Sequence, residues 1–566
     1  MGKLPPYAIL SHTWEDEEVT FQDFCDPDHA VRLSKKGFSK IQKTCRLASE
    51  LGLRYSWVDT CCIDKKSSAE LTEAINSMFQ WYQAAEVCFV WLADLPSLSS
   101  PGPTSHKQPS SGNITIPNLG RCRWFSRGWT LQELLAPGRV EFYDQAWKFR
   151  GTKIDLANQL TQITNIGEDV LRSPSIMQQL SIAQRMAWAA GRQTTRVEDM
   201  AYCLLGVFGV NMSMMYGEGT RAFIRLQEMI AAQSNDFSLF AWRENTNPED
   251  QAQIYRGVFA LSPNDFSGSA SVQLMGNPAY NPEFLITNKG LRMTPSIFAG
   301  ADGAYFLGLN CVDTAHRRAK EEIGIWIQAH GAGVYSRVKS SEYAFRPPSE
   351  QTPKIVRIFL SRTITFETSR QLEGSTDHAF ILRKGFNEAN IGKSHAPDFP
   401  FEAIQILPNE QWDSERHMFV TQGAGDFVAY AYFMVRFECE IFQTSELSSS
   451  ESFFLAFGRK LSEGAPWVCI SSLSETPALQ LAMGDARKIA VAVSSMKEKR
   501  MILLRDAYNW ISKAIHVSLE TATEGSQIIY YIDLELRDAP EKDLKGEEGA
   551  LSHPESYLYK KRNKLR

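Results

Sequence analysis

Two adjacent cysteines in the N-terminal part of the chain have neighbours suited to nucleophilic chemistry. Cys61 and Cys62 come directly after Asp59-Thr60, and His12 follows an earlier apolar segment. A thiolate activated by an imidazole is a strong nucleophile, so a Cys–His pair is one interpretation. A buried cysteine is also a common small hydrophobic residue, and this second interpretation makes both thiols part of a core.

Two short polar segments gather further residues that can bind a ligand. Ser11, His12 and Trp14 follow the first apolar segment, and Asp59 and Asp64 follow the second. If both apolar segments are strands of one parallel sheet, their carboxyl ends meet at the edge where such sheets bind ligands. The structural alternative is that these side chains cap turns or fix a loop through hydrogen bonds to the backbone.

The elements that position these residues alternate between strands and helices over the first 150 residues. This alternation predicts an α/β domain built around a parallel sheet. The predicted strands are Tyr7–Ser11, Tyr55–Thr60, Val87–Ala93 and Val140–Tyr143. The predicted helices are Ser34–Leu51, Ser68–Ala84 and Trp129–Leu135, and Pro96–Gly120 is expected to be a loop rich in Ser, Pro and Gly.

The rest of the chain divides into a helical block and a β-rich region. We predict a helical extension over residues 151–245, a β-rich domain over 246–540 and a charged tail over 541–566. The predicted helices are Ile176–Gln193, a second that opens with a capping box at Thr195 to Glu198, and Arg221–Gln233. The predicted strands are Val356–Thr368, Phe427–Phe442, Ile489–Val493 and Ile528–Leu536, which indicate an antiparallel sandwich or barrel.

Composition narrows the class of protein. Of 566 residues, 43% are hydrophobic and 22% charged, with 60 Lys and Arg against 65 Asp and Glu. A net charge of −5 gives no electrostatic footprint for nucleic acid, so we expect no such partner. We also expect no membrane span and no signal peptide. Because ten cysteines form no C-x-x-C, we expect no metal site and reduced thiols in the cytoplasm.

Three blocks resemble a known family in their residues, order and spacing. They are YAILSHTW at 7–14, WVDTCCIDK at 57–65 and RWFSRGWTLQELLAP at 123–137. Together they are similar to the fungal heterokaryon incompatibility (HET) domain, in the 1–150 domain. The resemblance implies a role in non-self recognition, in which such proteins trigger cell death when incompatible fungal cells fuse. Unlike many relatives, this chain has no G-x-x-x-x-G-K-[ST] phosphate loop and no repeats of ~40 residues.

The order of these segments also resembles a Toll/interleukin-1 receptor (TIR) domain, which implies a flavodoxin-like sheet. The matching residues of the Ser-x-x-Trp turn and the following helix are Ser126, Trp129 and Glu133, with Thr130 where those domains often have Cys. Enzymatic TIR domains cleave NAD at the nicotinamide–ribose bond with that glutamate. The resemblance therefore implies that Glu133 is catalytic.

Physical chemistry gives Glu133 two roles. A carboxylate stabilises the oxocarbenium-like charge that develops when an N-glycosidic bond breaks. Acids are also favoured in the first turn of a helix, which is the structural role we expect for Glu70 and Glu73. By the same comparison, Trp14 or Trp129 can stack on nicotinamide or adenine, whereas Trp129 as a core residue is the alternative.

Two functions therefore follow as expectations. In the first, the protein is an NAD glycohydrolase that needs no cofactor, with NAD as substrate. Its ligand-binding residues would then be Ser11, His12, Trp14, Asp59, Asp64, Ser126 and Trp129 beside Glu133. In the second, the domain is a non-enzymatic adaptor that self-associates or assembles with other incompatibility proteins. The β-rich region is then a sensor or regulatory module.

Overall fold

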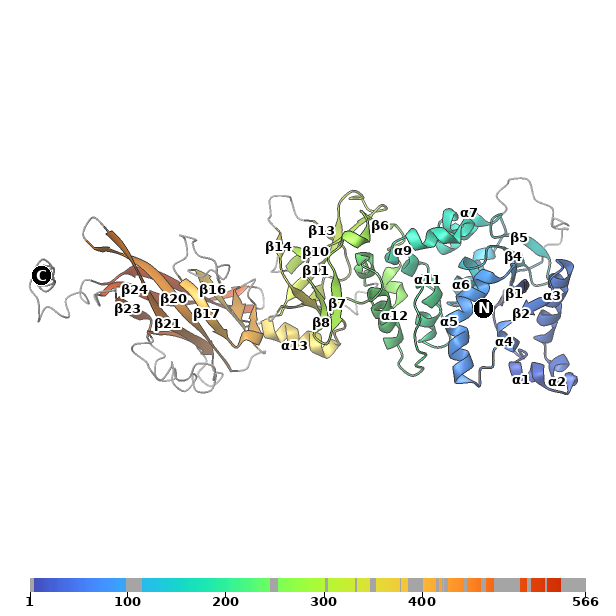
Figure 1. The fold of residues 1–566 in the computed structure, drawn as a ribbon, viewed down its shortest axis with the longest axis horizontal. Helices are drawn as coiled ribbons and strands as arrows, with labels where there is room; N and C mark the ends of the chain where they lie inside the picture. The colour runs from blue at the N-terminus through green and yellow to red at the C-terminus, as the bar shows by residue number, and fades with distance from the viewer. Residues whose placement is uncertain are drawn as a thin grey trace, which may run out of the picture. The chain divides into compact units, whose positions relative to one another are not determined.

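In a computed structural model, the chain forms two compact units, whose elements are labelled in Figure 1. The first comprises residues 1–252, 256–327 and 337–363, and the second 253–255, 328–336 and 364–566. The structure describes residues 5–540 except 98–114, 245–252, 301–303, 331–332, 347–352, 377, 385–400, 414–416, 420, 422–425, 442–444, 460–464, 473–498, 506–510 and 525–526. Most of the predicted loop Pro96–Gly120, the strand Ile489–Val493 and the charged tail at 541–566 lie outside the described residues.

The first unit begins with a five-stranded sheet in the order β2-β1-β3-β4-β5. The first four strands are parallel and β5 is antiparallel to β4. The predicted parallel α/β sheet is therefore confirmed, while the antiparallel β5 departs from an all-parallel flavodoxin-like sheet. The likeness to a TIR domain stays a prediction. The strands are β1 Tyr7–His12, β2 Tyr55–Trp57, β3 Val87–Trp91, β4 Val140–Tyr143 and β5 Phe149–Thr152.

Helices cover both faces of this sheet. Successive side chains of β1 point to opposite faces, so Ala8 and Leu10 pack with Ile41 and Ala48 of α3. In Figure 1, α3 lies on one side of the sheet, and α5 and α6 lie on the other. The helices are α1 Phe21–Cys25, α2 His29–Ser34, α3 Phe38–Glu50, α4 Asp59–Cys62, α5 Ser68–Ala84 and α6 Thr130–Leu135.

The helical extension is made of short helices, and two predictions there are wrong. The predicted helix Ile176–Gln193 is broken, because Ser181 caps a new helix by accepting a hydrogen bond from the Gln184 N–H. Thr195 opens no capping box, since Glu198 instead accepts hydrogen bonds from two N–H groups of a later turn. The elements are α7 Ala157–Thr164, α8 Glu168–Arg172, the 3-10 helix Pro174–Gln179, α9 Ile182–Ala187, α10 Asp199–Tyr202, α11 Leu205–Phe208 and α12 Arg221–Ala231.

A ten-stranded sheet follows the extension, with its main path in the order β14-β9-β10-β11-β12-β15-β8-β7. The predicted strand Val356–Thr368 is wrong over most of its length. Only β15 is a strand there, because Thr365 accepts a hydrogen bond from the Thr368 N–H and starts a helix. The strands are β6 Val272–Leu274, β7 Phe284–Thr287, β8 Gly290–Met293, β9 Ser296–Ala299, β10 Ala304–Asp313, β11 Ile323–Ala329, β12 Val334–Val338, β13 Ala344–Phe345, β14 Lys354–Ile355 and β15 Ile358–Leu360.

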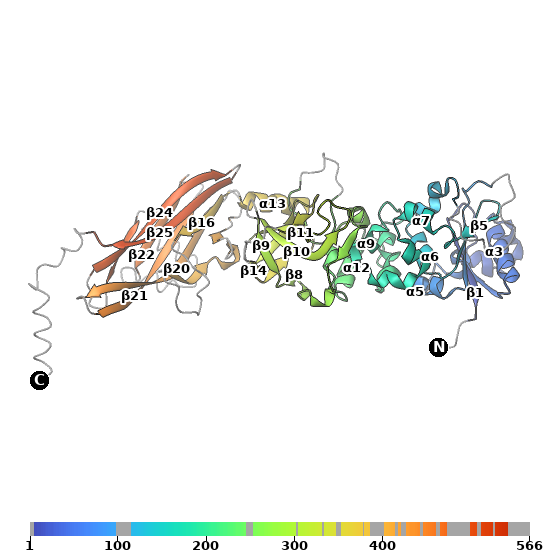
Figure 2. The same ribbon diagram turned by 90° about the horizontal axis from the view of Figure 1, so that it is seen from above.

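The second unit holds a six-stranded and a four-stranded sheet, seen from above in Figure 2. Both contribute to one aromatic core, which includes Phe380, Phe427 and Tyr530. This agrees with a β-rich region, although β16 pairs with β25 in parallel. The elements are α13 Phe366–Thr376, β16 His378–Lys384, β17 Phe401–Leu407, β18 Trp412–Asp413, β19 Met418–Phe419, β20 Phe427–Ile441, β21 Ser445–Arg459, β22 Pro466–Ser472, β23 Met501–Arg505, β24 Ile511–Glu524 and β25 Gln527–Asp538.

Candidate functional site

A buried glutamate lies against the carboxyl end of β1. The hydroxyl of Ser11 donates a hydrogen bond to the carboxylate of Glu133 in α6, so the structure brings together two of the predicted site residues. The indole N–H of Trp124 donates to Ser11 Oγ at 2.7 Å. The Ser11 hydroxyl therefore accepts a hydrogen bond from Trp124 and donates one to Glu133. Trp124 was not predicted as a site residue, although it lies within the third block, RWFSRGWTLQELLAP at 123–137.

The short helix α6 is fixed at both ends, which holds Glu133 in place. At its start, the Thr130 hydroxyl lies 2.5 Å from the Trp124 carbonyl oxygen and 2.9 Å from that of Arg127. At its end, the Lys153 ammonium donates to the carbonyl oxygens of Leu134 at 3.2 Å and Pro137 at 2.6 Å. A lysine is rarely buried without a carboxylate. Burial lowers the pKa of Lys153 to about 8.

Burial sets the charge of Glu133. Its side chain is only 7% exposed, and this burial raises the pKa of Glu133 to about 8. The hydrogen bond from Ser11 acts in the opposite direction, the negative charge of Asp59 raises the pKa further, and Arg127 and Arg192 lower it. A carboxyl group with this pKa exchanges its proton near neutral pH, which is the condition for acid–base or charge-stabilising work in a site.

A second cluster surrounds Asp59, beyond the carboxyl ends of β1 and β2. The Trp14 indole N–H donates to Asp59 Oδ2 at 2.7 Å, and the Lys65 ammonium lies 3.5 Å from the centre of the Trp14 ring. His12 Nδ1 lies 3.8 Å from Asp59 Oδ1. The structure thus joins three predicted residues and adds Lys65. The sequence signal for Lys65 is its place at the end of the second block.

Two polar atoms of this second cluster are unsatisfied within the part of the chain that the structure describes. They are His12 Nε2 and Asp59 Oδ1. Burial, reinforced by Lys40, lowers the pKa of His12 to about 3, so the imidazole is neutral at physiological pH. Burial also raises the pKa of Asp59. Because buried polar atoms normally have partners, these two are available to a hydroxyl group or water.

Asp59 belongs to the second cluster, and its negative charge also raises the pKa of Glu133 in the first. Ser11 and His12 are consecutive on β1, so they point to opposite faces of the sheet. Asp59 contacts Trp14 on one side, while its charge acts on Glu133 on the other. The candidate site is thus one edge of the sheet with a buried carboxyl group, a neutral imidazole, an aromatic ring and a cation.

Three other predicted residues have local partners. Asp64 accepts hydrogen bonds from Gln22 Nε2 at 2.6 Å and from a backbone N–H two residues on, which fixes its loop. Ser126 is exposed and donates to the Arg123 carbonyl oxygen at 2.9 Å. Trp129 is half-buried and makes a hydrogen bond with Asp199 of the extension. Among the described contacts, none places these three in either cluster, and their ligand-binding roles stay predictions.

The two thiols contact the backbone of Val58. Cys62 Sγ accepts a hydrogen bond from the Val58 N–H at 3.4 Å, and the Cys61 thiol donates to the Val58 carbonyl oxygen at 3.8 Å. The neighbouring thiol lowers the pKa of Cys62, whereas the pKa of Cys61 is raised. The ion-pair contacts of His12 are Asp59 and Glu18. Over the described residues we therefore find no contact that pairs His12 with a thiol, and the Cys–His hypothesis has no geometric support there.

The acidic residues at the start of α5 have the places expected of helix-start residues. Glu70 accepts a hydrogen bond from the Asp64 N–H at 2.9 Å, and Glu73 is exposed. In the described parts of the chain, no group of three or more His, Cys, Asp or Glu residues could hold a metal ion. In those same parts, no helix has the length and apolar character needed to cross a bilayer.

Comparison with known proteins identifies the segment that carries this edge. Residues 7–133 match the sequence model of a family described as "Heterokaryon incompatibility protein (HET)". The chain is 44% identical over 233 residues to "Vegetative incompatibility protein HET-E-1" of Podospora anserina. That match covers 40% of this chain and 16% of the relative, so the chain spans less than a fifth of the relative's length. No solved structure matches the chain significantly.

Proposed function

We propose that this chain, whose residues 7–133 match the HET family model, acts in heterokaryon incompatibility by cleaving NAD at the nicotinamide–ribose bond. The observation that carries the proposal is the buried carboxyl group of Glu133, held by Ser11 and Trp124 at the ligand-binding edge of a parallel sheet. Loss of NAD would then be the event that kills the cell.

In the proposed reaction, the bond between the ribose C1′ and the nicotinamide nitrogen breaks, and its electron pair leaves with nicotinamide. Positive charge develops on the ribose, and the Glu133 carboxylate stabilises that charge. Water then adds to C1′ and loses a proton, which gives ADP-ribose. No oxidant or reductant is needed.

The second cluster supplies the groups that we assign to substrate binding. Trp14, which is 46% exposed, offers an aromatic face for stacking on a base. The ammonium of Lys65 lies over the Trp14 ring, and its positive charge suits a pyrophosphate. Asp59 and His12 have free polar atoms, within the described structure, for ribose hydroxyls. Because Glu133 is buried here, the reaction also requires this edge to open when substrate enters.

The alternative function is a non-enzymatic adaptor. The low exposure of Glu133 favours it, because a fully enclosed carboxyl group is also what a purely structural residue shows. In this function the same blocks form a surface that self-associates or binds other incompatibility proteins. Death then follows from the partners.

The test is nicotinamide release from NAD by the full chain at high protein concentration. We expect release by the wild-type protein and none by Glu133→Gln, which keeps the shape of the side chain and removes its charge. The matched control is Glu73→Gln, the same change at an exposed helix position, and it should release nicotinamide as the wild type does. Equal release by wild type and Glu133→Gln, or none by a folded and self-associated wild type, would leave the adaptor function as the better explanation.

A further inference from the structure

A buried arginine of the helical extension contacts the segment that leads into α6. Arg192 is 6% exposed. Its Nη1 donates to the Arg127 carbonyl oxygen at 2.9 Å and to Thr130 Oγ1 at 3.1 Å, and its Nε donates to the Trp188 carbonyl oxygen at 3.0 Å. One guanidinium group therefore ties the extension to the first residue of α6.

The backbone beside Arg192 reinforces this contact. The Gly128 N–H donates to the Gln193 carbonyl oxygen at 2.8 Å, and the Gln193 N–H donates to the Ser126 carbonyl oxygen at 2.7 Å. The approach is so close that a Cβ on Gly128 would lie 2.5 Å from Thr194 Cγ2. The extension thus pairs directly with the turn before α6, and a larger residue at Gly128 would require the Thr194 side chain to shift.

A chain of hydrogen bonds runs from Arg192 to the candidate catalytic carboxyl group. Arg192 donates to Thr130, whose hydroxyl donates to the Trp124 carbonyl oxygen. The Trp124 indole donates to Ser11, and Ser11 donates to Glu133. Arg192 is therefore linked through Thr130 and Trp124 to Ser11, which contacts Glu133.

The charge of Arg192 has no hydrogen-bonded anion among the described residues, since its three acceptors are neutral oxygens. A buried guanidinium without such a partner is costly. The negative groups that favour its charged form are Cys203 and Glu133. Because burial raises the pKa of the Cys203 thiol to about 12, Glu133 is the acid that ionises first.

We propose that Arg192 is a positioning residue for Glu133: it fixes the start of α6 and, together with Arg127, adds positive charge that favours the carboxylate. The catalytic unit then includes the helical extension, beyond the residues 7–133 that match the HET family. The assignment of Glu133 as the catalytic group rests on the proposed function, whereas the contact and the charge coupling do not.

Other charged and titratable groups also face Glu133 and belong in any pH argument. Asp59 raises its pKa, and Arg127 lowers it together with Arg192. Three weak acids also interact electrostatically with Glu133, namely Tyr82, Cys88 and Cys203. Burial raises the pKa of each, so they remain protonated at the pH at which Glu133 ionises. Arg192 is the cation that comes from the extension, so its removal tests the coupling specifically.

The experiment compares Arg192→Met with Arg185→Met in the full chain. Arg185 is a matched control, because it is also a buried arginine of the extension, 8% exposed, and it donates to the Val207 carbonyl oxygen. For each background, the unfolding free energies of the Glu133 and Glu133→Gln forms are measured in urea across pH 5–10. The pH at which their difference levels off reports the ionisation of Glu133 in the folded protein, without any need for NAD.

We expect this pH to rise in Arg192→Met, because a neighbouring positive charge has been lost. It should stay unchanged in Arg185→Met. An unchanged value in Arg192→Met, or an equal rise in both variants, would overturn the charge coupling. If the wild type releases no nicotinamide, the proposed function fails, and this measurement still decides the inference.

Arg192→Lys separates position from charge and serves if Arg192→Met does not fold. Lysine keeps the charge, but its single nitrogen cannot contact the Thr130 hydroxyl and the Trp188 carbonyl oxygen as Nη1 and Nε of the guanidinium do. We expect an unshifted ionisation of Glu133 and a kcat for nicotinamide release lowered about tenfold or more with little change in KM. A kcat equal to that of the wild type would show that Arg192 does not position the site.

Discussion

Two opposing effects act on the pKa of the Glu133 carboxyl group: hydrogen bonding lowers it and burial raises it, and burial is the larger effect. Ser11 donates directly to it and Trp124 supports Ser11, which favours the charged form. Nevertheless, burial holds the pKa of Glu133 at about 8. Ionisation of a carboxyl group in such a place weakens the fold, which is typical of residues retained for function.

Glu133→Gln should therefore stabilise the protein, and increasingly so as the pH rises. A folded-state pKa above the unfolded value means that the stability contribution is complete below about pH 4.5 and is lost as the pH rises towards 8. The gain of the variant over the wild type should grow between pH 5 and 8 to a few kcal/mol, roughly 1.4 for each pH unit. Urea unfolding at several pH values measures it, and a gain that does not depend on pH would contradict the burial argument.

The same ionisation predicts how nicotinamide release depends on pH. The carboxylate form is the one that stabilises positive charge on the ribose, so kcat should rise as the pH passes through about 8. The release assay run from pH 6 to 9.5 tests this. A rate that falls over this range would mean that the protonated form acts, as a general acid.

At the scale of single residues, some contacts of the candidate site could be predicted from the sequence and others could not. Ser11 and Glu133 could be predicted to share one edge, because a strand end and a following helix carry them in a recognisable order. Lys153 and Arg192 could not, since lysine and arginine are usually exposed and only tertiary packing buries these two side chains. Which tryptophan meets Ser11 is likewise decided by packing.

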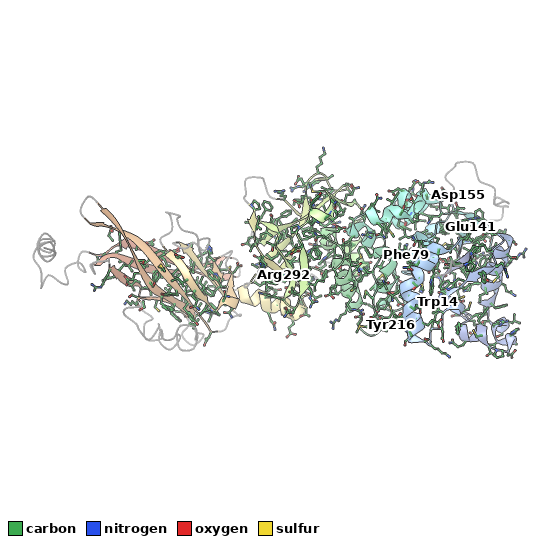
Figure 3. The ribbon with its side chains drawn as sticks, viewed as in Figure 1. Trp14, Phe79, Glu141, Asp155, Tyr216 and Arg292 are labelled. Atoms are coloured by element: carbon green, nitrogen blue, oxygen red, sulfur yellow. The ribbon has the colours of Figure 1, made fainter. Side chains whose placement is uncertain are left out.

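Among the elements, α5 depends on a close approach by the extension. A Cβ on Gly206 in α11 would lie 2.1 Å from Phe79 Cβ on α5, and Figure 3 labels Phe79. Asn76 of the same helix exchanges two hydrogen bonds of 3.0 Å with the Met212 backbone. The extension thus packs on the helix that covers the Ser11 face of the sheet.

Gly206→Ala should destabilise the protein by about 2–3 kcal/mol, because overpacking outweighs the helix propensity that alanine adds. The matched control is Gly138→Ala, since a Cβ there has nothing within 4 Å. We expect that control to stay within about 0.5 kcal/mol of the wild type. Thermal or urea unfolding gives both values, and equal stability of the two variants would argue against the close packing.

The wrong element predictions share one physical cause, which is local capping combined with tertiary contacts. The sequence from Ile176 to Gln193 has helical character throughout, but Ser181 caps a new helix and the Ile182 N–H donates to Asp236. The Val356–Thr368 segment is rich in β-branched residues, yet Thr365 starts a helix. Strong periodic segments such as Ser68–Ala84 and Val140–Tyr143 were predictable to the residue.

For the whole molecule, the predicted boundary near residue 245 runs through a set of buried contacts in the first unit. Gln227 exchanges two hydrogen bonds with the Ala260 backbone, at 2.8 and 2.9 Å. The Trp242 indole donates to the Val258 carbonyl oxygen, and the buried Arg337 donates to the Phe240 carbonyl oxygen. The N-terminal α/β domain, the helical extension and the ten-stranded sheet are therefore expected to share their stability.

Truncation tests this expectation. A chain that ends at residue 363 keeps all of these contacts and should melt at the temperature of the first unit in the full protein. A chain that ends at 242 leaves buried groups of Gln227 and Trp242 without partners, so its Tm should fall by about 10 °C or more.

A chain that ends at 150 also loses Arg192 and the helices that cover α5, and we expect no cooperative transition. Calorimetry on the three fragments distinguishes these outcomes. A cooperative transition of the 150-residue fragment at the temperature of the 363-residue fragment would instead make the N-terminal α/β domain independent, and would remove the structural reason for placing part of its site in the extension.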